Sequence, residues 1–188
     1  MGSGDFTVIT NSANLENLLN PFHSIIGDDF AGYRGHLYRV LNYSLWLLAG
    51  EKKYRAVLEF VLVYHDIGLW TARKLAYLEP SIEAALLASQ KEGHGFDPQL
   101  LKDIIFYHHK VFAFRGPNAT IVNAFRKADW IDFSQGKIKK GVPAEFIYRV
   151  KEQIPAAGFY AALDRLGPEL SDHNRLKMVG EFLKVFKI

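Results

Sequence analysis

Apolar residues recur every three or four positions along most of the chain, which is the spacing of helices that bury one face against a core. Two runs show the pattern most clearly: Leu37, Val40, Leu41, Leu45 and Leu48, then Ala56, Phe60, Val63 and Tyr64. No segment alternates apolar and polar residues for long enough to predict a β-strand, and no internal repeat interrupts the pattern. The pattern predicts an all-α protein folded as a single irregular helical bundle.

Glycine, proline and aspartate residues place the ends of the predicted helices. We expect helices over about 28–49, 51–68, 80–91, 98–109, 118–135 and 143–155, followed by two shorter ones. Gly50 and Gly68 suit helix C-termini, where a left-handed residue is common. Asp97 followed by Pro98 gives an N-cap and a proline at the first helical position. The first two helices are separated by so short a turn that they should form an antiparallel pair.

The chain of 188 residues has the size of one domain. We expect a single helical domain over 12–188, with its functional core between about residues 28 and 136. Residues 1–11 are expected to be a disordered or vector-derived N-terminus, because Met1-Gly2-Ser3-Gly4 is typical of a cloning remnant. The sequence lacks the pattern of a secretory signal, and its apolar runs are far shorter than the roughly 20 residues of a membrane span. A cytoplasmic protein without a membrane partner is predicted.

The composition narrows the possible chemistry. The chain contains no cysteine, which excludes disulfides, thiolate zinc sites and a cysteine nucleophile, so any metal must be held by nitrogen and oxygen atoms. The formal net charge is only +3, and basic residues are scattered apart from Lys137, Lys139 and Lys140. No surface for a nucleic-acid polymer is therefore indicated.

The C-terminal segment 171–188 carries apolar residues at helical spacing: Leu176, Val179, Phe182, Leu183 and Phe186. We expect this helix to pack on the bundle. A contact within a homodimer is the alternative, so the sequence is compatible with a monomer or a homodimer. Segment 157–160 is a candidate to approach the functional site.

The sharpest polar feature is His65-Asp66, which follows an apolar run and precedes Gly68. Adjacent residues lie about 100° apart around a helix, so both side chains can face one ion only where the helix ends. Gly68 suits such an end. Taken alone, the pair is more typical of a buried histidine beside a helix-capping aspartate than of a metal site.

Two further residues favour a shared site. His36 lies on the preceding predicted helix, and antiparallel packing can bring its ring to that of His65. Asp129 lies within a strongly apolar predicted helix, where an unpaired carboxylate would be costly. A bound cation would remove that cost, so these residues together predict a metal site.

The order of His36, His65-Asp66 and a distant Asp129 resembles the pattern of the HD superfamily of metal-dependent phosphohydrolases, over about residues 28–136. The resemblance implies an HD-type helical fold in which all four residues bind a divalent metal. Such ligands suit Mn²⁺, Fe²⁺, Co²⁺, Ni²⁺, Zn²⁺ or Mg²⁺, so the ligand types do not decide which ion is bound.

The resemblance also leaves open whether one or two ions are bound. His108-His109 resembles the histidine pair of many two-metal HD proteins, and Glu79 stands before Pro80 where those proteins carry another histidine. Glu79 and His108 are therefore candidate ligands of a second ion, bridged to the first by Asp66, while His109 would contact substrate. For Glu79, the alternative is a helix N-terminal residue favoured by the helix dipole.

Basic residues flank these positions: Arg39, Lys110, Arg115 and Arg126. Several of them could converge on a phosphate, so a small anionic substrate is expected, although each could also be a surface charge or part of an ion pair. Tyr33 could line the mouth of the site. His94, in a loop flanked by glycines, is either an exposed residue or part of a lid.

The resemblance implies hydrolysis of a small phosphorylated or nucleotide-like substrate by metal-activated water. Asp66 or Asp129 would orient the water or accept its proton, and His109 would protonate the leaving oxygen. Leu69 stands where some single-metal nucleotidases have an acidic residue and where cyclic-dinucleotide-cleaving relatives have a lysine. The Gly-Tyr-Pro signature of those relatives is also absent, so neither activity is expected.

Two alternatives to hydrolysis stay open. Some HD proteins are di-iron oxygenases that cleave a phosphonate or a polyol with four histidines and two carboxylates as ligands. Here that set would require Glu79 in the place of one histidine. The other alternative is a ligand-binding protein that keeps the fold without activity, but the full set of four candidate ligands favours an enzyme.

Overall fold

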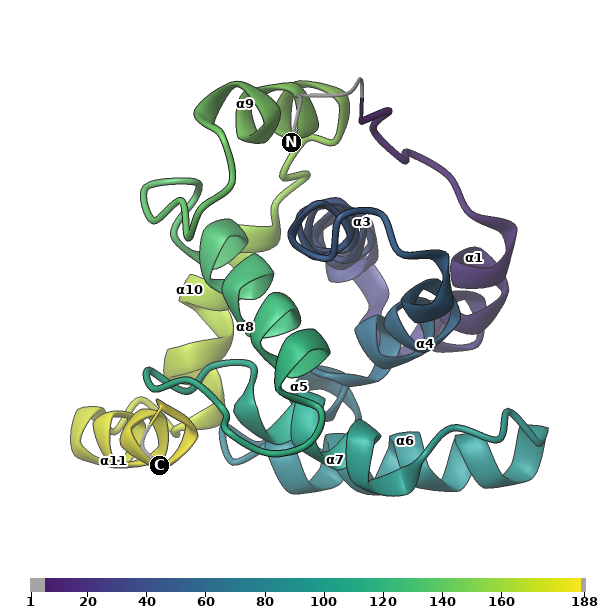
Figure 1. The fold of residues 1–188 in the computed structure, drawn as a ribbon. Coiled ribbons are helices and arrows are strands. Elements are labelled where there is room, and N and C mark those ends of the chain that lie inside the picture. The colour runs from purple at the N-terminus through teal and green to yellow at the C-terminus, as the bar shows by residue number, and fades with distance from the viewer. Residues whose placement is uncertain (1–5, 187–188) are drawn as a thin grey trace.

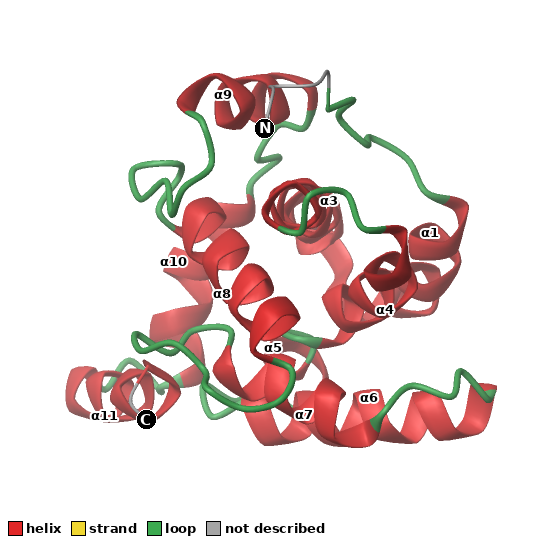
Figure 2. Cartoon of the chain, viewed as in Figure 1, coloured by secondary structure: helices red, strands yellow, loops and turns green. Residues whose placement is uncertain are grey.

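The computed structural model describes residues 6–186, and this range contains helices and loops but no β-strand (Figure 2). The α-helices are α1 (Ala13–Leu19), α2 (His23–Ile26), α3 (Phe30–Leu47), α4 (Arg55–Tyr64), α5 (Gly68–Thr71), α6 (Leu78–Glu92), α7 (Pro98–Tyr107), α8 (Ala119–Phe133), α9 (Ala144–Gln153), α10 (Phe159–Leu170) and α11 (Arg175–Phe186). Three 3-10 helices complete the described chain: η1 (Asn20–Phe22), η2 (Gly27–Asp29) and η3 (Lys52–Tyr54). The all-α prediction is confirmed. Among the described residues, no helix is both long and apolar enough to cross a bilayer.

Helix α3 forms the centre of the bundle. Helices α4, α8, α9 and α10 pack against it, and Figure 1 looks along its axis with these helices around it. Every residue from 32 to 45 except Arg34 is buried. A helix enclosed in this way must be apolar on all sides, or its polar side chains must find partners inside the protein. His36, Arg39 and Asn42 each have such a partner.

Helices α6 and α7 pack against each other and against α4, and α7 also contacts α8. Helix α11 lies at the edge of the bundle against α10 (Figure 1). Only Val185 of α11 is buried, and Leu176, at 86% exposure, points into solvent. The C-terminal helix thus packs on the bundle, as expected, but through one face only.

Most predicted helix boundaries match the structure, and one differs in an informative way. Asp97 caps α7 by accepting a hydrogen bond from the backbone N of Gln99 (2.9 Å). The helix predicted over 51–68 is instead α4, a turn over 65–67, and α5, which begins at Gly68. Gly68 does not end a helix, and its role is close approach, because a Cβ there would lie 2.6 Å from the carbonyl oxygen of Tyr77.

Residues 6–11 form an extended segment along the bundle. The backbone N of Ile9 donates to Asn42 Oδ1 (2.8 Å), and Asn42 Nδ2 donates back to the carbonyl of Ile9 (2.9 Å). Phe6 packs edge-on against Phe146, with ring centroids 5.8 Å apart. This part of the N-terminus therefore packs on the domain that it was expected to lie outside. Residues 1–5 of the same expectation lie outside the described residues.

Candidate metal centre

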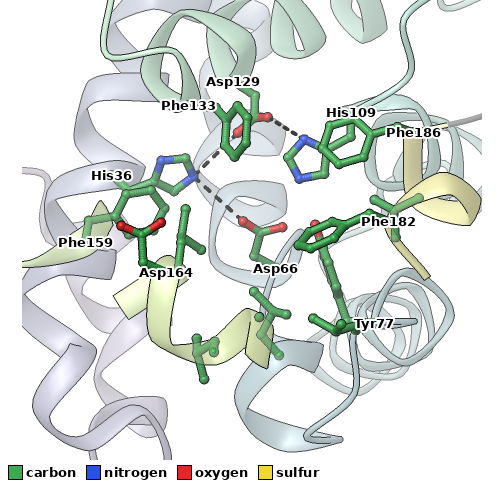
Figure 3. A pocket seen from close by; sticks show the side chains of 16 residues that line it. His36, Asp66, Tyr77, His109, Asp129, Phe133, Phe159, Asp164, Phe182 and Phe186 are labelled. Atoms are coloured by element: carbon green, nitrogen blue, oxygen red, sulfur yellow. Dashed lines mark ion pairs between the residues drawn. The ribbon is translucent and has the colours of Figure 1, made fainter. Parts of the chain in front are cut away.

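Four histidines and two aspartates meet in the interior of the bundle. They are His36 on α3, His65 and Asp66 directly after α4, His108 and His109 directly after α7, and Asp129 on α8. All six are buried. In Figure 3, four of them face one another across one end of a pocket: His36, Asp66, His109 and Asp129. The structure thus brings together the four predicted metal ligands and both members of the histidine pair.

The end of α4 orients His65. Its Nδ1 donates to the carbonyl of Leu62 (2.7 Å), while the hydroxyl of Tyr33 donates to the carbonyl of Val63 (3.0 Å). These bonds satisfy carbonyls that have no partner within the helix. A carbonyl can only accept, so Nδ1 of His65 carries the hydrogen and Nε2 keeps a free lone pair.

The same arrangement recurs at two other rings. His108 Nδ1 donates to the carbonyl of Ile105 (2.6 Å) at the end of α7. His36 Nδ1 donates to Asp132 Oδ2 (2.7 Å) on α8. In each case Nδ1 is bonded to the protein and Nε2 points to the centre of the cluster, which is how protein histidines are usually held when they bind a metal.

The distances between these free atoms fit a metal ion. Nε2 of His36 lies 3.1 Å from Nε2 of His65, which lies 3.2 Å from Asp66 Oδ2. Asp129 Oδ1 lies 3.6 Å from Nε2 of His36. Atoms bound at about 2.1 Å to a tetrahedral or octahedral ion are about 3.0 to 3.4 Å apart when they are neighbours. Two lone pairs at 3.1 Å repel each other unless a proton or a metal ion lies between them, so the cluster could hold an ion.

A second group of possible ligands adjoins the first. Ligand atoms of Asp66, His108 and His109 all lie within 4.8 Å of one another, as do those of the group formed by His36, His65 and Asp66. Asp66 Oδ1 lies 3.2 Å from Nε2 of His108 and, although buried, has no hydrogen-bond partner. Asp66 belongs to both groups, so its carboxylate could bridge two ions.

The electrostatics of the cluster favour a cation. Burial lowers the pKa of His65, but the carboxylates of Asp66 and Asp129 outweigh it, and the pKa is raised. Burial alone would raise the pKa of Asp66, yet His65 and His108 hold it well below its ordinary value. Burial, together with His109, lowers the pKa of His108 to about 4, so this ring is neutral near pH 7. The ionised carboxylates and the neutral His108 are in the protonation states that metal binding requires, whereas His65, whose pKa is raised, would have to release a proton to bind an ion.

Asp132 supports the centre from behind. It accepts the hydrogen bond from His36 and receives two more from Arg39, at 2.6 Å from Nε and 3.0 Å from Nη2. Sequence reasoning did not assign it a role. The available signal was its position three residues after Asp129 on the same predicted helix, which places both carboxylates on one face.

The cluster lies at one end of a pocket of about 170 Å³ whose other walls are mostly apolar. The apolar walls include Leu69, Leu75, Phe133, Phe159, Phe182 and Phe186. Phe159 stacks on the ring of His36 at 4.2 Å, and Phe186 stacks on that of His109 at 5.0 Å. Segment 157–160 therefore does approach the site, through Phe159.

The basic residues expected to bind substrate are engaged elsewhere. Arg39 is fully buried in its pair with Asp132, and Lys110 Nζ donates to a backbone carbonyl of α11 (3.1 Å). Arg126 Nη1 donates to two backbone carbonyls that follow α7, at 3.0 and 3.1 Å. Arg115 is exposed on the loop before α8. The structure does not bring any of these four to the pocket.

Three other candidates also lie away from the pocket. Tyr33 is completely buried behind the cluster, so it does not line a mouth. Glu79 is exposed on the first turn of α6 and lines a separate surface hollow with Lys102, while Tyr77, which precedes α6, reaches the pocket instead. Nε2 of His94 lies 2.7 Å from a carboxylate oxygen of Glu92 in a surface contact. Glu79 therefore does not complete a metal site, and His94 does not cover one.

Comparisons with protein-family models, with curated proteins and with solved structures find no match to this chain. The geometry itself defines a buried group of histidines and aspartates that could hold a metal ion at one end of an apolar pocket. Such a centre can polarise a bound ligand or activate water.

Proposed function

We propose that this chain is a metal-dependent hydrolase of the HD type that releases phosphate from a small phosphorylated substrate. The observation that carries the proposal is the 3.1 Å approach of two Nε2 atoms, of His36 and His65, whose hydrogens are held on Nδ1. Asp66 and Asp129 stand beside them. The order of these four residues along the chain and the all-helical fold support membership of the HD superfamily.

Each residue of the candidate centre has its own role in the proposed reaction. His36, His65, Asp66 and Asp129 would hold a divalent ion, which when bound lowers the pKa of water towards ~7 and offsets the charge of phosphoryl oxygens. His109 lines the pocket, and its Nδ1 lies 3.0 Å from Asp129 Oδ2. With one ion bound, His109 would be placed to protonate the leaving oxygen. If two ions were bound, His108 and His109 would hold the second one together with Asp66.

The apolar walls exclude water from the reaction. Phe159 covers the face of His36, and Phe186 covers that of His109. Removing water lowers the local dielectric, so a charge that develops on the substrate interacts more strongly with the ligands.

Release of inorganic phosphate from phenyl phosphate tests the proposal, using protein stripped of metal and reloaded with Mn²⁺, Co²⁺, Ni²⁺ or Mg²⁺. We expect activity that depends on metal and falls at least about 100-fold in His65→Ala, because a ligand has been removed. His94→Ala is the matched control, since His94 lies outside the pocket, and it should retain full activity. Equal activity in His65→Ala, or no phosphate release by fully loaded protein, would contradict the proposal.

A di-iron oxygenase is the second candidate, and a specific observation favours it. Four imidazoles and two carboxylates gather at the centre without any need for Glu79. This is the ligand count of the di-iron oxygenases in the HD superfamily. Oxygen uptake by iron-loaded protein with a phosphonate or polyol, without phosphate release from phenyl phosphate, would establish this activity in place of hydrolysis.

A further inference from the structure

The volume of the pocket limits the substrate. At about 170 Å³ it is close to the size of a cavity of about 150 Å³ that holds one benzene molecule. A ribose with its nucleobase is far larger than benzene. The space between the pocket walls, which is partly open to solvent, therefore fits an organic group of one small ring or a short chain.

The walls of the pocket determine the chemistry of that group. Phenylalanine and leucine side chains from α8, α10 and α11 face it. Among the described residues that line the pocket there is neither lysine nor arginine. A single phosphate can be neutralised by metal ions at the cluster, but a second anionic group would meet no positive charge in the pocket.

Asp164, an exposed residue, adds a negative charge at the solvent-facing rim of the pocket. It lies on α10, and Figure 3 shows its carboxylate beside Phe159, on the side of the pocket that faces His36. Among the described residues it takes part in no hydrogen bond or ion pair, whereas its neighbour Arg165 is paired with Asp29 outside the pocket. An unengaged carboxylate at this position attracts a hydrogen-bond donor and repels an anion.

We propose that the substrate carries one phosphate on a small apolar group that ends in a hydrogen-bond donor such as an ammonium group, and that Asp164 selects it. This inference rests on the proposed function, because the phosphate is placed at the metal centre. By this inference, nucleotides are too large for the pocket, and compounds that carry a carboxylate or a second phosphate are repelled by the charge of Asp164.

Binding of three phosphonates built on the same two-methylene chain tests the inference without turnover: propylphosphonate, 2-aminoethylphosphonate and 3-phosphonopropionate. They differ only in a terminal methyl, ammonium or carboxylate group. Calorimetric titration of Mn²⁺-loaded protein should give the tightest binding for the ammonium compound and the weakest for the carboxylate. Adenosine 5′-monophosphate, the size probe, should not bind.

Asp164→Asn removes the charge and keeps the shape of the side chain. We expect it to reduce the preference for the ammonium over the carboxylate compound by about tenfold. Asp28→Asn is the matched control, because Asp28 is an exposed aspartate that does not line the pocket. An unchanged preference in Asp164→Asn, equally tight binding of the nucleotide, or no binding of any phosphonate would overturn the inference.

The outcomes separate this inference from the proposed function. If the phosphonates bind in the expected order but no phosphate monoester is hydrolysed, the hydrolase proposal fails and the ligand class stands. If monoesters are hydrolysed equally well whatever their terminal group, the hydrolase stands and the role of Asp164 is wrong.

Discussion

At the scale of single residues, each of three imidazoles has one nitrogen bonded to the protein and one directed to the cluster. The acceptors are two backbone carbonyls, for His65 and His108, and one carboxylate, for His36. These hydrogen bonds fix ring orientation and tautomer before any ion binds. The cost of ordering the ligands is thus met during folding, which favours tight metal binding.

Asp132→Asn tests the support behind His36. The change leaves the guanidinium of Arg39 buried without its counter-charge. We therefore expect the free energy of unfolding to fall by about 3 to 5 kcal/mol. Metal affinity should fall about 10- to 100-fold, because His36 loses the acceptor that orients it. Denaturant unfolding and metal titration measure the two effects. Glu16→Gln, in the partly exposed pair with Arg34, is the control and should cost less than about 1 kcal/mol.

The same variant has a predicted pH dependence. Burial alone would raise the pKa of Asp132, but His36 and Arg39 lower it by more, so the folded value lies below the ordinary one. A depressed pKa contributes stability above the unfolded pKa of about 3.9, and this stability is lost as the pH falls through the folded value. The difference in unfolding free energy between wild type and Asp132→Asn should therefore shrink below about pH 4. A difference that stays constant down to pH 2 would show that folding does not lower the pKa of Asp132.

At the scale of elements, most of the candidate metal ligands lie directly after the ends of helices. His65 and Asp66 follow α4, and His108 and His109 follow α7, so the ligands sit where the backbone turns away from the helix axis. Neighbouring residues can face one centre only at such a place. The middles of α3 and α8 supply His36 and Asp129 from the other side.

Gly68→Ala tests the close approach that lets the turn after Asp66 pack on α6. A Cβ would lie 2.6 Å from the carbonyl of Tyr77 and 3.0 Å from Ser81 Oγ. We therefore expect the free energy of unfolding, measured with heat or denaturant, to fall by about 1 to 3 kcal/mol. Gly180→Ala on α11 is the control. A Cβ there meets nothing within 4 Å, and alanine should stabilise the helix by up to about 1 kcal/mol. Equal effects of the two changes would exclude a packing role for Gly68.

Helix α11 contributes part of the pocket wall. Phe186→Ala removes the ring that stacks on His109, so we expect kcat/KM for 1-naphthyl phosphate to rise about tenfold relative to that for phenyl phosphate. Leu176→Ala, on the exposed side of the same helix, should leave the ratio unchanged. A ratio unaltered by Phe186→Ala would mean that α11 does not limit substrate size.

Long amphipathic helices could be predicted from the sequence by their periodicity and capping residues. The predicted bounds of α3, α7 and α8 lie within a few residues of the observed ones. The short helices α1, α2 and α5 could not, because four to seven residues contain too little periodicity to identify a helix. The turn at 65–67 was also missed. Gly68 was interpreted as a helix end, and the contact with Tyr77 that explains it lies outside the local sequence.

At the scale of the whole molecule, the pocket lies between elements that are distant in the sequence. The histidines and aspartates at one end of the pocket could be predicted to meet, because a polar residue on an otherwise apolar helix stands out in the sequence. The structure brings these residues together. Its walls were not predictable. Phe159, Asp164 and Phe182 come from helices whose position on the bundle depends on tertiary packing. Basic residues near the ligands in sequence were assigned to substrate, yet they satisfy buried carbonyls and Asp132 instead.

Metal removal should lower the stability of the whole domain. The candidate ligands come from α3, α8 and the turns after α4 and α7, so a bound ion would link most of the bundle. A ligand present at about 1,000 times its dissociation constant stabilises the folded state by about 4 kcal/mol. We therefore expect a chelator to lower the melting temperature of wild type, measured by calorimetry, and to have no effect on Asp66→Asn. A chelator effect of equal size in both proteins would place the ion elsewhere.

The metal centre is tested most directly by anomalous diffraction from crystals of Mn²⁺-loaded protein, collected above and below the manganese absorption edge. We expect an anomalous peak among Nε2 of His36, Nε2 of His65 and the carboxylates of Asp66 and Asp129. A second peak beside His108 and His109 would establish a two-ion centre. Full manganese loading with no anomalous peak within bonding distance of His65 or Asp66 would contradict the metal site on which the proposed function depends.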